Sequence, residues 1–252
     1  DELQSWTGIP VGNIRLQFRG EQVVSRALRN PIMEGCPACL REEAKKDPVQ
    51  PLSMMTMRGD WQLREVTVCL RHRRLLVPLW TEDQQTQRFD IQGQLLQILD
   101  RIMAGDMDGA KVEPSPFDIW LDDRLSGQPD PTWLAPHCTG ASAMFCRMFG
   151  KGMMAGAQAE DPIRQRHNAA AAGFTLVREG PEAIKSNLID LAARGETGSD
   201  PVRQAHRRMF EALDTHLLDD PSFDVFRTVL RDAVLNIWPI AAGETVLGAV
   251  LD

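Results

Sequence analysis

Residues 35–76 read GCPACLREEAKKDPVQPLSMMTMRGDWQLREVTVCLRHRRLL. This segment holds three of the five cysteines of the chain and one of its five histidines, arranged as two tight pairs, Cys36-x2-Cys39 and Cys69-x2-His72. Two residues between ligands let one turn direct both side chains at the same point, which is typical of metal sites. Three thiolates and one imidazole complete a tetrahedral shell, the closed form expected of structural zinc. We therefore predict one structural Zn²⁺ bound by Cys36, Cys39, Cys69 and His72.

The sequence around the two pairs predicts the local structure that would hold them. Gly35 and Pro37 flank the first cysteine and predict a sharp turn whose backbone amides can point at sulfur. The 29 residues between Cys39 and Cys69 exceed the usual zinc-ribbon spacing, so the ring closed by the metal must contain structure of its own. Helical periodicity disappears over 51–80, where EVTVC and RRLLVPLW predict short strands carrying the second pair.

Two other uses of the cysteines compete with the metal site. Free cysteine packs as a small hydrophobic residue, so these thiols could be ordinary core residues beside a surface histidine. Disulfides are a second alternative, but an acidic, Met-rich sequence with no secretory signal in view indicates a cytosolic protein, in which thiols stay reduced. Cys138 and Cys146, in the apolar stretch PHCTGASAMFCRMFG, are predicted to be core thiols, with His137 a less favoured ligand.

Length and charge set limits on the class of protein. A chain of 252 residues with 43% hydrophobic content can bury one large core or two modest ones. The net charge of -7 argues against indiscriminate nucleic-acid binding, although Arg71, Arg73 and Arg74 cluster beside the metal pairs and predict a local DNA contact. Since no run of 18 apolar residues exists, no membrane span is expected, and we predict a cytoplasmic protein. The sequence starts at Asp1 rather than Met, so we expect it to be part of a longer protein.

Helical signals dominate outside the metal segment. Residues 7–18 place a cap at Thr7 before apolar residues near helical spacing, which predicts a helix. Further along, residues 89–106 are amphipathic and stop at Gly105, and a helix is predicted to start at Ser115 with Pro116 in its first position. Five more helices are predicted from their caps and prolines in the C-terminal half, within TGASAMFCRMFG, DPIRQRHNAAAAGF, GPEAIKSNLIDLAARG, SDPVRQAHRRMFEALDTHLLDD and PSFDVFRTVLRDAVLNIW.

These signals predict a mainly α fold with a small β-containing zinc ribbon or knuckle. Residues 1–30 are predicted to be the remnant of a helical, helix-turn-helix-like region, residues 31–80 the zinc-binding domain, and residues 81–252 a helical domain with room for two sub-bundles. No fixed sequence period indicates a repeat array.

The usual local marks of catalysis are missing. The sequence has no G-x-x-x-x-G-K-[ST], G-x-G-x-x-G, H-E-x-x-H or G-x-S-x-G pattern. Asp118, Asp122 and Asp123 lie close together on one predicted helix and would suit a divalent-metal nuclease, but acidic residues are common on helix surfaces and need no catalytic role. We therefore predict that the chain is not an enzyme.

The pattern CPACLREE…W…VTVCLRHRRLL resembles the signature of the TniQ family, transposition proteins that include the TnsD-type target selectors. The matching residues are Cys36, Pro37, Cys39, Leu40, Glu42, Trp61, Val66, Thr67, Val68, Cys69, His72, Leu75 and Leu76. A weaker similarity to larger bacterial members extends from roughly Leu3 to Gly248. Many members carry a second cysteine set soon after the first, whereas TEDQQTQRFD follows Trp80 here, so a single zinc site is expected.

The resemblance implies a non-catalytic adaptor that selects a transposition target. Such a protein links target DNA or a targeting complex, in some members a CRISPR effector complex, to the AAA+ ATPase regulator of a transposase. Self-association of the helical half as a homodimer is a further expectation. Two alternatives stay open: a zinc-containing, sequence-specific DNA-binding regulator, and a divalent-metal nuclease.

Overall fold

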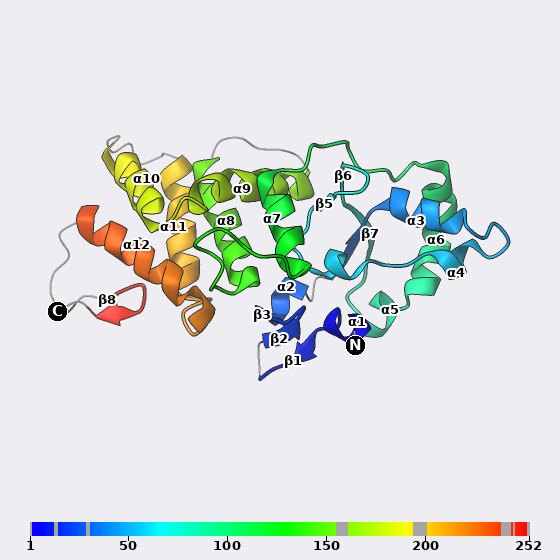
Figure 1. Ribbon diagram of the computed structural model, residues 1–252, viewed down its shortest axis with the longest axis horizontal. Helices are drawn as coiled ribbons and strands as arrows, with labels where there is room; N and C mark the ends of the chain where they lie inside the picture. The colour runs from blue at the N-terminus through cyan, green and yellow to red at the C-terminus, as the bar shows by residue number, and fades with distance from the viewer. Residues whose placement is uncertain are drawn as a thin grey trace. The chain divides into compact units, whose positions relative to one another are not determined.

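The chain divides into two compact units, each described by itself. The computed structural model describes residues 2–12, 15–28, 31–154, 161–193, 201–237, 243 and 245–250. The first unit comprises Asp1–Gly127 with Asp161–His167, and the second comprises Gln128–Glu160 with Asn168–Asp252. Both are mainly helical with a few short strands (Figure 1), which confirms the predicted fold class. The predicted domain limits at residues 30 and 80 stay predictions.

An antiparallel sheet opens the first unit. Its strands pair in the order β1 (Ile9–Pro10), β2 (Arg15–Phe18), β3 (Glu21–Val24). Arg19 and Gly20 have φ angles of 52° and 81°, the left-handed conformation that a two-residue hairpin turn between twisted strands requires. Leu16 and Phe18 are buried while their neighbours are half-buried, so the side chains alternate along β2 with the period of a strand.

The helix predicted over residues 7–18 is therefore wrong. The apolar residues of this stretch follow the period of two of a strand, and the Arg19-Gly20 turn folds β2 back onto β3. Where residues 1–30 are described, their helices are four residues long, α1 (Glu2–Ser5) and α2 (Ser25–Leu28), instead of the predicted helix-turn-helix-like region.

The segment predicted to bind metal combines short helices with strand pairs. In chain order it forms β4 (Ile32–Gly35), α3 (Pro37–Ala44), α4 (Pro51–Met54), η1 (Gly59–Gln62), β5 (Val68–Cys69), β6 (Arg74–Leu75) and β7 (Val77–Thr81). Strand β4 pairs antiparallel with β7, and β5 forms a hairpin with β6. The strands predicted from EVTVC and RRLLVPLW are thus confirmed.

Three helices complete most of the first unit: α5 (Gln85–Arg88), α6 (Ile91–Ala104) and α7 (Pro116–Leu125). The predicted ends of α6 and α7 are confirmed. Helix α6 stops at Gly105, whose φ of 85° is the left-handed conformation of a helix C-terminus. Helix α7 starts with a capping box, in which Ser115 and Asp118 bond each other's backbone amides, and Pro116 occupies its first turn.

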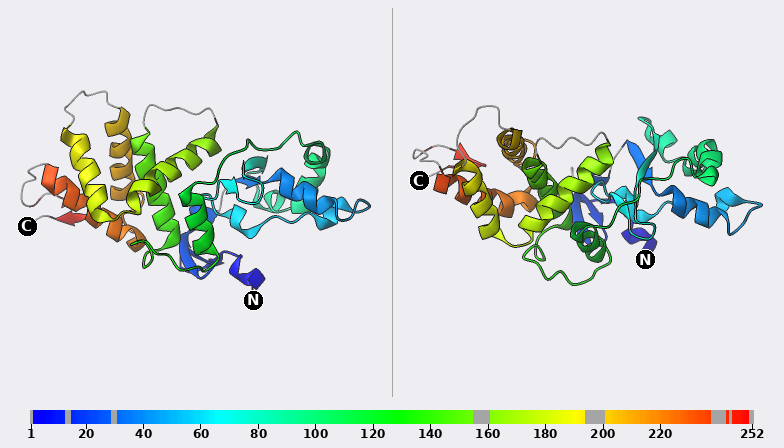
Figure 2. Two further views of the ribbon diagram at one scale, coloured as in Figure 1. Left: turned by 45° about the horizontal axis from the view of Figure 1, so that its top comes forward. Right: turned by 90° about the horizontal axis from the view of Figure 1, so that it is seen from above.

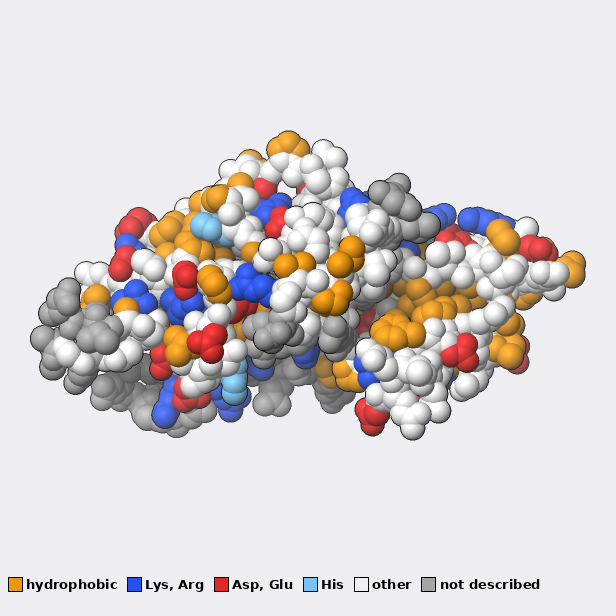
Figure 3. Space-filling view, turned by 90° about the horizontal axis from the view of Figure 1, so that it is seen from below, with side chains coloured by type: hydrophobic (Ala, Val, Ile, Leu, Met, Phe, Trp, Pro, Cys, Tyr) orange, Lys and Arg blue, Asp and Glu red, His pale blue; other side chains and the backbone are white. Residues whose placement is uncertain are grey.

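One hydrophobic cluster joins the metal segment to α6. Leu40, Leu76 and Ile102 are at most 1% exposed and belong to the same buried cluster as the three metal-segment cysteines. Some apolar residues remain exposed, such as Phe89, which follows α5, and Leu96 of α6, and Figure 3 shows hydrophobic side chains on the surface of the first unit. The cysteine pairs are therefore integral to the core of this unit.

The second unit is built from the remaining helices and a short hairpin (Figure 2). Its elements are α8 (Thr139–Met153), the later part of α9 (Pro162–Val177), α10 (Pro181–Ala193), α11 (Pro201–Asp214), η2 (Pro221–Phe223), α12 (Asp224–Ile237), β8 (Thr245–Val246) and β9 (Ala249–Val250). Helix α8 packs on α11, and α10 on α12. The five helices predicted for this half are confirmed. No helix within the described ranges is long and apolar enough to cross a membrane.

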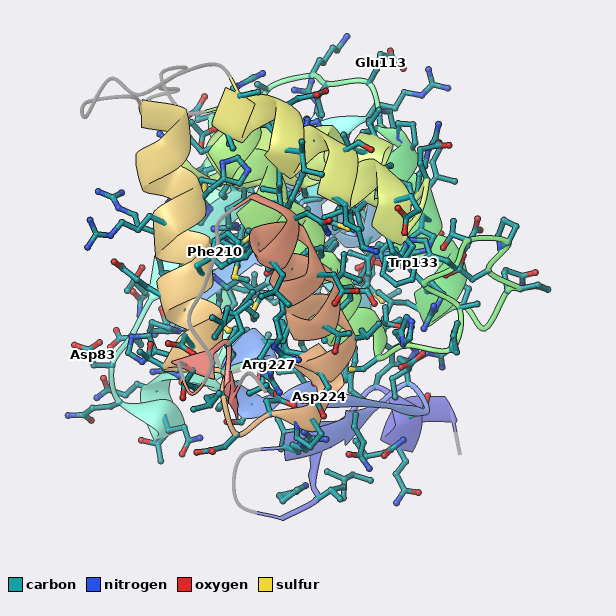
Figure 4. The ribbon with its side chains drawn as sticks, turned by 90° about the vertical axis from the view of Figure 1, so that its left-hand side faces the viewer. Asp83, Glu113, Trp133, Phe210, Asp224 and Arg227 are labelled. Carbon is teal, nitrogen blue, oxygen red and sulfur yellow. The ribbon has the colours of Figure 1, made fainter. Side chains whose placement is uncertain are left out.

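Aromatic residues form much of the second core. The rings of Phe145 and Phe226 stack with centroids 4.2 Å apart, and Trp133 lies edge-on to Phe226 at 6.0 Å. Arg227 is 5% exposed and donates to the Leu217 carbonyl oxygen, which satisfies its buried charge. Figure 4 shows Arg227 near the start of α12, beside its carboxylate partner Asp224.

The two cysteines of the second unit differ in burial. Cys146 is fully buried, as predicted, whereas Cys138, the residue just before α8, is only half-buried. The prediction of a core thiol is therefore wrong for Cys138. His137 packs edge-on against the rings of Trp133 and Phe226, which gives it an aromatic contact and no place in the metal cluster described below.

Candidate metal centre

The first cysteine pair lies where β4 ends and α3 begins. Cys36 is the residue just before α3, and Pro37 occupies the first turn of the helix, where its missing amide is not needed. Gly35 packs so closely that an added Cβ would lie 2.7 Å from the Leu79 side chain. One helical turn then places Cys39 on the same side of α3 as Cys36.

The second pair lies on the β5–β6 hairpin. Cys69 ends β5, and His72 lies in the turn that leads to Arg74 at the start of β6. The backbone amide of Arg73 donates to the Cys69 carbonyl oxygen at 2.8 Å, and Arg73 has a φ of 51°, which closes the turn. The hairpin therefore presents Cys69 and His72 toward the same point.

The four predicted ligands come together as one compact donor set. Their donor atoms all lie within 4.8 Å of one another. His72 Nδ1 is 3.6 Å from Cys36 Sγ, 3.2 Å from Cys39 Sγ and 3.6 Å from Cys69 Sγ, and the Cys39 and Cys69 sulfurs are 3.6 Å apart. Around an ion with sulfur at about 2.3 Å and nitrogen at about 2.0 Å, tetrahedral donors lie roughly 3.5–3.8 Å apart. The residues therefore fit a four-coordinate metal ion.

Burial closes this site on its protein side. The three cysteines are at most 4% exposed, and the His72 side chain is 16% exposed. Backbone amides also point at sulfur, as predicted from Gly35 and Pro37: the Cys39 amide bonds Cys36, and the His72 amide bonds Cys69. With four protein donors, no coordination position of a tetrahedral ion is left for a substrate, which is typical of structural metal sites.

Without a bound cation, the three thiols influence one another's ionisation, because they are hydrogen-bonded and close together. Hydrogen bonds from Cys36 and Cys39 lower the pKa of Cys69. Hydrogen bonds with Cys36 and Cys69 raise the pKa of Cys39. The pKa of Cys36 is raised to about 11, because its bond to Cys69 and its burial outweigh the opposing bond to Cys39. A divalent cation removes this mutual effect by replacing the thiol protons.

Glu42 extends the site on the far side of the histidine ring. Its Oε1 lies 2.9 Å from His72 Nε2, and its Oε2 lies 2.6 Å from Arg71 Nη2. The hydrogen bond with His72 lowers the pKa of Glu42. Burial lowers the pKa of His72, but the bonds to Glu42 and Cys69 outweigh burial and raise it.

A mostly buried ion pair connects α3 to the segment that follows α6. Arg41 donates to both carboxylate oxygens of Asp108 at 2.9 and 2.8 Å and to the Ile102 carbonyl oxygen at 2.8 Å. Arg74 donates to the Gly109 carbonyl oxygen at 2.6 Å. These bonds hold the helix that carries Cys39 against the hairpin that carries Cys69.

The segment after Gly109 also pairs with the hairpin. The Leu75 amide donates to Ala110, and the Val112 amide donates to the Arg73 carbonyl oxygen, both at 2.9 Å. Gly109 approaches so closely that an added Cβ would lie 2.0 Å from the Leu75 carbonyl oxygen. The outer edge of β6 is therefore covered instead of open.

The three arginines predicted to contact DNA have different surroundings. Arg71 and Arg73 are 60% and 67% exposed, and each pairs with a carboxylate, Glu42 and Glu113 respectively. The Arg74 side chain is 24% exposed and is bound to Asp108 and Gly109 within the fold. Of the three, Arg73 is the most exposed, and its carboxylate partner Glu113 is itself 84% exposed.

The acidic residues considered for a nuclease do not assemble a second metal site. In the described part of the chain, the Cys36, Cys39, Cys69 and His72 group is the one set of three or more acidic, histidine or cysteine side chains close enough for a single ion. Asp118 instead caps α7. Asp122 lines a small surface pocket with Asp60, and its pKa is raised by burial and by the charge of Asp60.

Sequence reasoning singled out the four residues of this cluster but missed the residues that contact them from outside it. Glu42 was a member of the sequence pattern without an assigned role, although its spacing of three after Cys39 places both on one face of α3. Asp108 gave no such signal, because it lies 67 positions from Arg41. Only the fold of the whole unit reveals this pair.

Comparison with known proteins agrees with this site. Residues 1–76 match the family model TniQ, which ends at Leu76 and includes both ligand pairs. Searches among curated proteins and among solved structures found no significant match. The resemblance drawn from the sequence is thus confirmed over its most specific part. Residues 1–76 are therefore similar to the TniQ domain of transposition-associated proteins.

Proposed function

We propose that this chain is a non-catalytic adaptor for transposition target selection. In this role it links target DNA, or a targeting complex such as a CRISPR effector, to the AAA+ ATPase regulator of a transposase. The observation that carries the proposal is the coincidence of the TniQ match with a closed four-donor cluster in the same residues. A closed site supports structure instead of bond chemistry, because it leaves no position for substrate.

We propose Zn²⁺ as the ion. Three thiolates and an imidazole at tetrahedral separations are the donors and the geometry that zinc prefers among structural metals. When bound, the ion would supply a cross-link between α3 and the β5–β6 hairpin. That cross-link joins segments about 30 residues apart in the sequence. The three cysteines are also part of the hydrophobic core of this unit.

Direct DNA contact by the hairpin is part of the proposal. Arg71 and Arg73 are its exposed cations, and they support phosphate contact better than base readout because both lie on a short turn. The same arginines favour the second candidate, a zinc-containing DNA-binding regulator. The two candidates differ in their protein partner, since the regulator needs no AAA+ ATPase.

Affinity capture with an AAA+ ATPase regulator of a transposase from the same genome tests the proposal. The purified chain is immobilised, and retention of the ATPase is measured with and without target DNA. The adaptor predicts retention in at least one condition, whereas the regulator predicts DNA binding without retention. Absence of ATPase retention in both conditions would overturn the adaptor proposal.

A cleavage assay separates the adaptor from the nuclease alternative. Plasmid DNA is incubated with the chain and Mg²⁺ or Mn²⁺, and the adaptor predicts intact DNA. Cleavage that copurifies with the chain and disappears in an Asp122→Asn variant would instead support the nuclease.

A further inference from the structure

Glu42 is positioned to determine which ring nitrogen of His72 binds the metal. Histidine can bind an ion through either ring nitrogen, and the hydrogen bond made by the other nitrogen selects between them. Here Nδ1 faces the three sulfurs at 3.2–3.6 Å, while Nε2 faces Glu42 at 2.9 Å. The ring is therefore oriented between the donor cluster and one carboxylate.

We propose that Glu42 is a positioning residue, which accepts a hydrogen bond from His72 Nε2 and so fixes Nδ1 as the metal-binding nitrogen. This inference rests on the proposed function only in taking the cluster to bind zinc. Ligand histidines commonly donate their second ring nitrogen to a carboxylate, and losing that partner typically weakens metal binding 10–100-fold.

The helix supplies the ligand and its support from one face. Cys36, Cys39 and Glu42 follow one another at intervals of three residues, so they lie along the same side of the start of α3. Cys39 Sγ is the sulfur closest to His72 Nδ1, at 3.2 Å. A single element thus positions two metal ligands and orients a third that belongs to a different segment.

Arg71 in turn holds the carboxylate. It binds Glu42 Oε2 at 2.6 Å, which leaves Oε1 for His72. Each carboxylate oxygen has a different partner, so the plane of the carboxylate is fixed. We therefore assign Arg71 a role in supporting the metal site, with a smaller effect than that of Glu42 because the Arg71 side chain is 60% exposed.

Zinc affinity of the full chain tests this assignment. The wild-type chain is compared with Glu42→Ala and Glu42→Gln in a competition titration against a chromophoric chelator. We expect Glu42→Ala to bind zinc 10–100-fold more weakly, Glu42→Gln less so because an amide oxygen can still accept the bond, and each to bind one ion at saturation. Glu43→Ala is the matched control, since it removes the adjacent carboxylate of α3, which bonds the Thr56 amide instead of His72.

The ring nitrogens provide a readout that a general loss of stability would not change. In zinc-loaded protein labelled with ¹⁵N-histidine, the chemical shifts of His72 are expected to show a metal-bound Nδ1 and a protonated Nε2. Metal binding through Nε2 in the wild type, or affinity of both Glu42 variants within twofold of the Glu43→Ala control, would overturn the inference. A wild-type chain that binds no zinc would instead overturn the proposed zinc site. The Glu42→Gln variant preserves size and hydrogen bonding, so it provides the affinity comparison if Glu42→Ala fails to fold.

Discussion

Three thiols packed within hydrogen-bonding distance of each other are stable together only while a cation or their own protons neutralise them. Cys36 and Cys39 can each donate to the thiolate of Cys69, but a second or third thiolate in the same buried space would meet strong repulsion. A divalent ion permits all three to ionise. A divalent ion bound there would convert a cluster that resists ionisation into a cross-link.

Removing one thiolate should therefore remove both the ion and much of the stability of the first unit. We expect Cys36→Ser and Cys69→Ser to reduce zinc from one ion per chain to nearly none and to destabilise this unit by about 3 kcal/mol or more, since structural zinc supplies roughly 10–16 kcal/mol of apparent binding free energy in finger peptides. Atomic absorption and thermal unfolding measure the two effects. Cys138→Ser, which removes a half-buried thiol of the second unit, should retain zinc. Unchanged zinc content in both ligand variants would contradict the assigned ligands.

The ion pair beside the metal centre makes stability depend on pH in a defined direction. Hydrogen bonds from Arg41 lower the pKa of Asp108 below its ordinary value of 3.8. A carboxyl whose pKa is lowered by folding contributes stability above its unfolded pKa and loses that contribution as the pH falls through its folded pKa. The Arg41–Asp108 pair should thus contribute its full stabilisation at neutral pH and lose it only in acid.

Replacing Asp108 with Asn measures this contribution. At pH 7 we expect Asp108→Asn to lower the free energy of unfolding by about 1.5–3 kcal/mol, the usual value of hydrogen bonds to charged groups. The difference from wild type should narrow when urea unfolding is repeated below about pH 4, near the unfolded pKa of Asp. A difference that stays constant between pH 7 and pH 3 would show that the Asp108 charge contributes nothing.

At the scale of elements, α8 and α9 pack with their backbones almost in contact. A Cβ added to Gly150 would lie 1.8 Å from the Ala169 carbonyl oxygen, and one added to Gly173 would lie 1.8 Å from the Cys146 carbonyl oxygen. Both glycines are inside helices, where alanine is intrinsically preferred by about 1 kcal/mol. Close approach of the helices therefore outweighs propensity at these positions.

Gly173→Ala should consequently destabilise the second unit in spite of the better helix former. The new methyl group must separate α8 from α9, and overpacking of this kind typically costs about 1–3 kcal/mol or more. Chemical denaturation followed by circular dichroism measures the loss. As the matched control, Ala172→Gly at the adjacent half-buried position tests propensity alone and should cost about 1 kcal/mol. A stabilised Gly173→Ala variant would mean that the two helices are not in close contact.

Elements were predictable from the sequence where their signals are local. The Ser115 cap with Pro116 and the stop at Gly105 operate within one helical turn, so they could be identified without knowing the fold. The N-terminal sheet was missed because its decisive feature is the positive φ of Arg19, a residue type that rarely adopts it. The grouping of Cys36, Cys39, Cys69 and His72 was predictable for the same reason as the caps, since each pair spans four residues.

Interactions between residues far apart in the sequence were not predictable in this way. Glu34 is 5% exposed and its carboxylate lies 2.5 Å from Arg166, which is 132 positions away. No composition or spacing rule connects the two. Because this pair lies within the first unit, the segment Asp161–His167 returns to that unit after an excursion of the chain through residues 128–160.

At the scale of the whole molecule, each unit has its own core, and only the first contains the metal ligands. The buried cluster of the first unit includes Cys36, Cys39 and Cys69, whereas Phe145 and Phe226 stack in the second. Loss of zinc should therefore loosen one unit and spare the other. Uniform weakening would require a single cooperative core, which the division into two compact units argues against.

Hydrogen exchange with and without a zinc chelator tests this independence. We expect peptides from residues 31–80 to exchange at least tenfold faster after chelation, because the cross-link between α3 and the β5–β6 hairpin is gone. Peptides from α8 and α12 should keep their exchange rates, since their aromatic packing does not involve the ion. Re-addition of zinc should restore slow exchange in 31–80. Equal acceleration in α8, α12 and residues 31–80 would show that the metal stabilises the molecule as one cooperative structure.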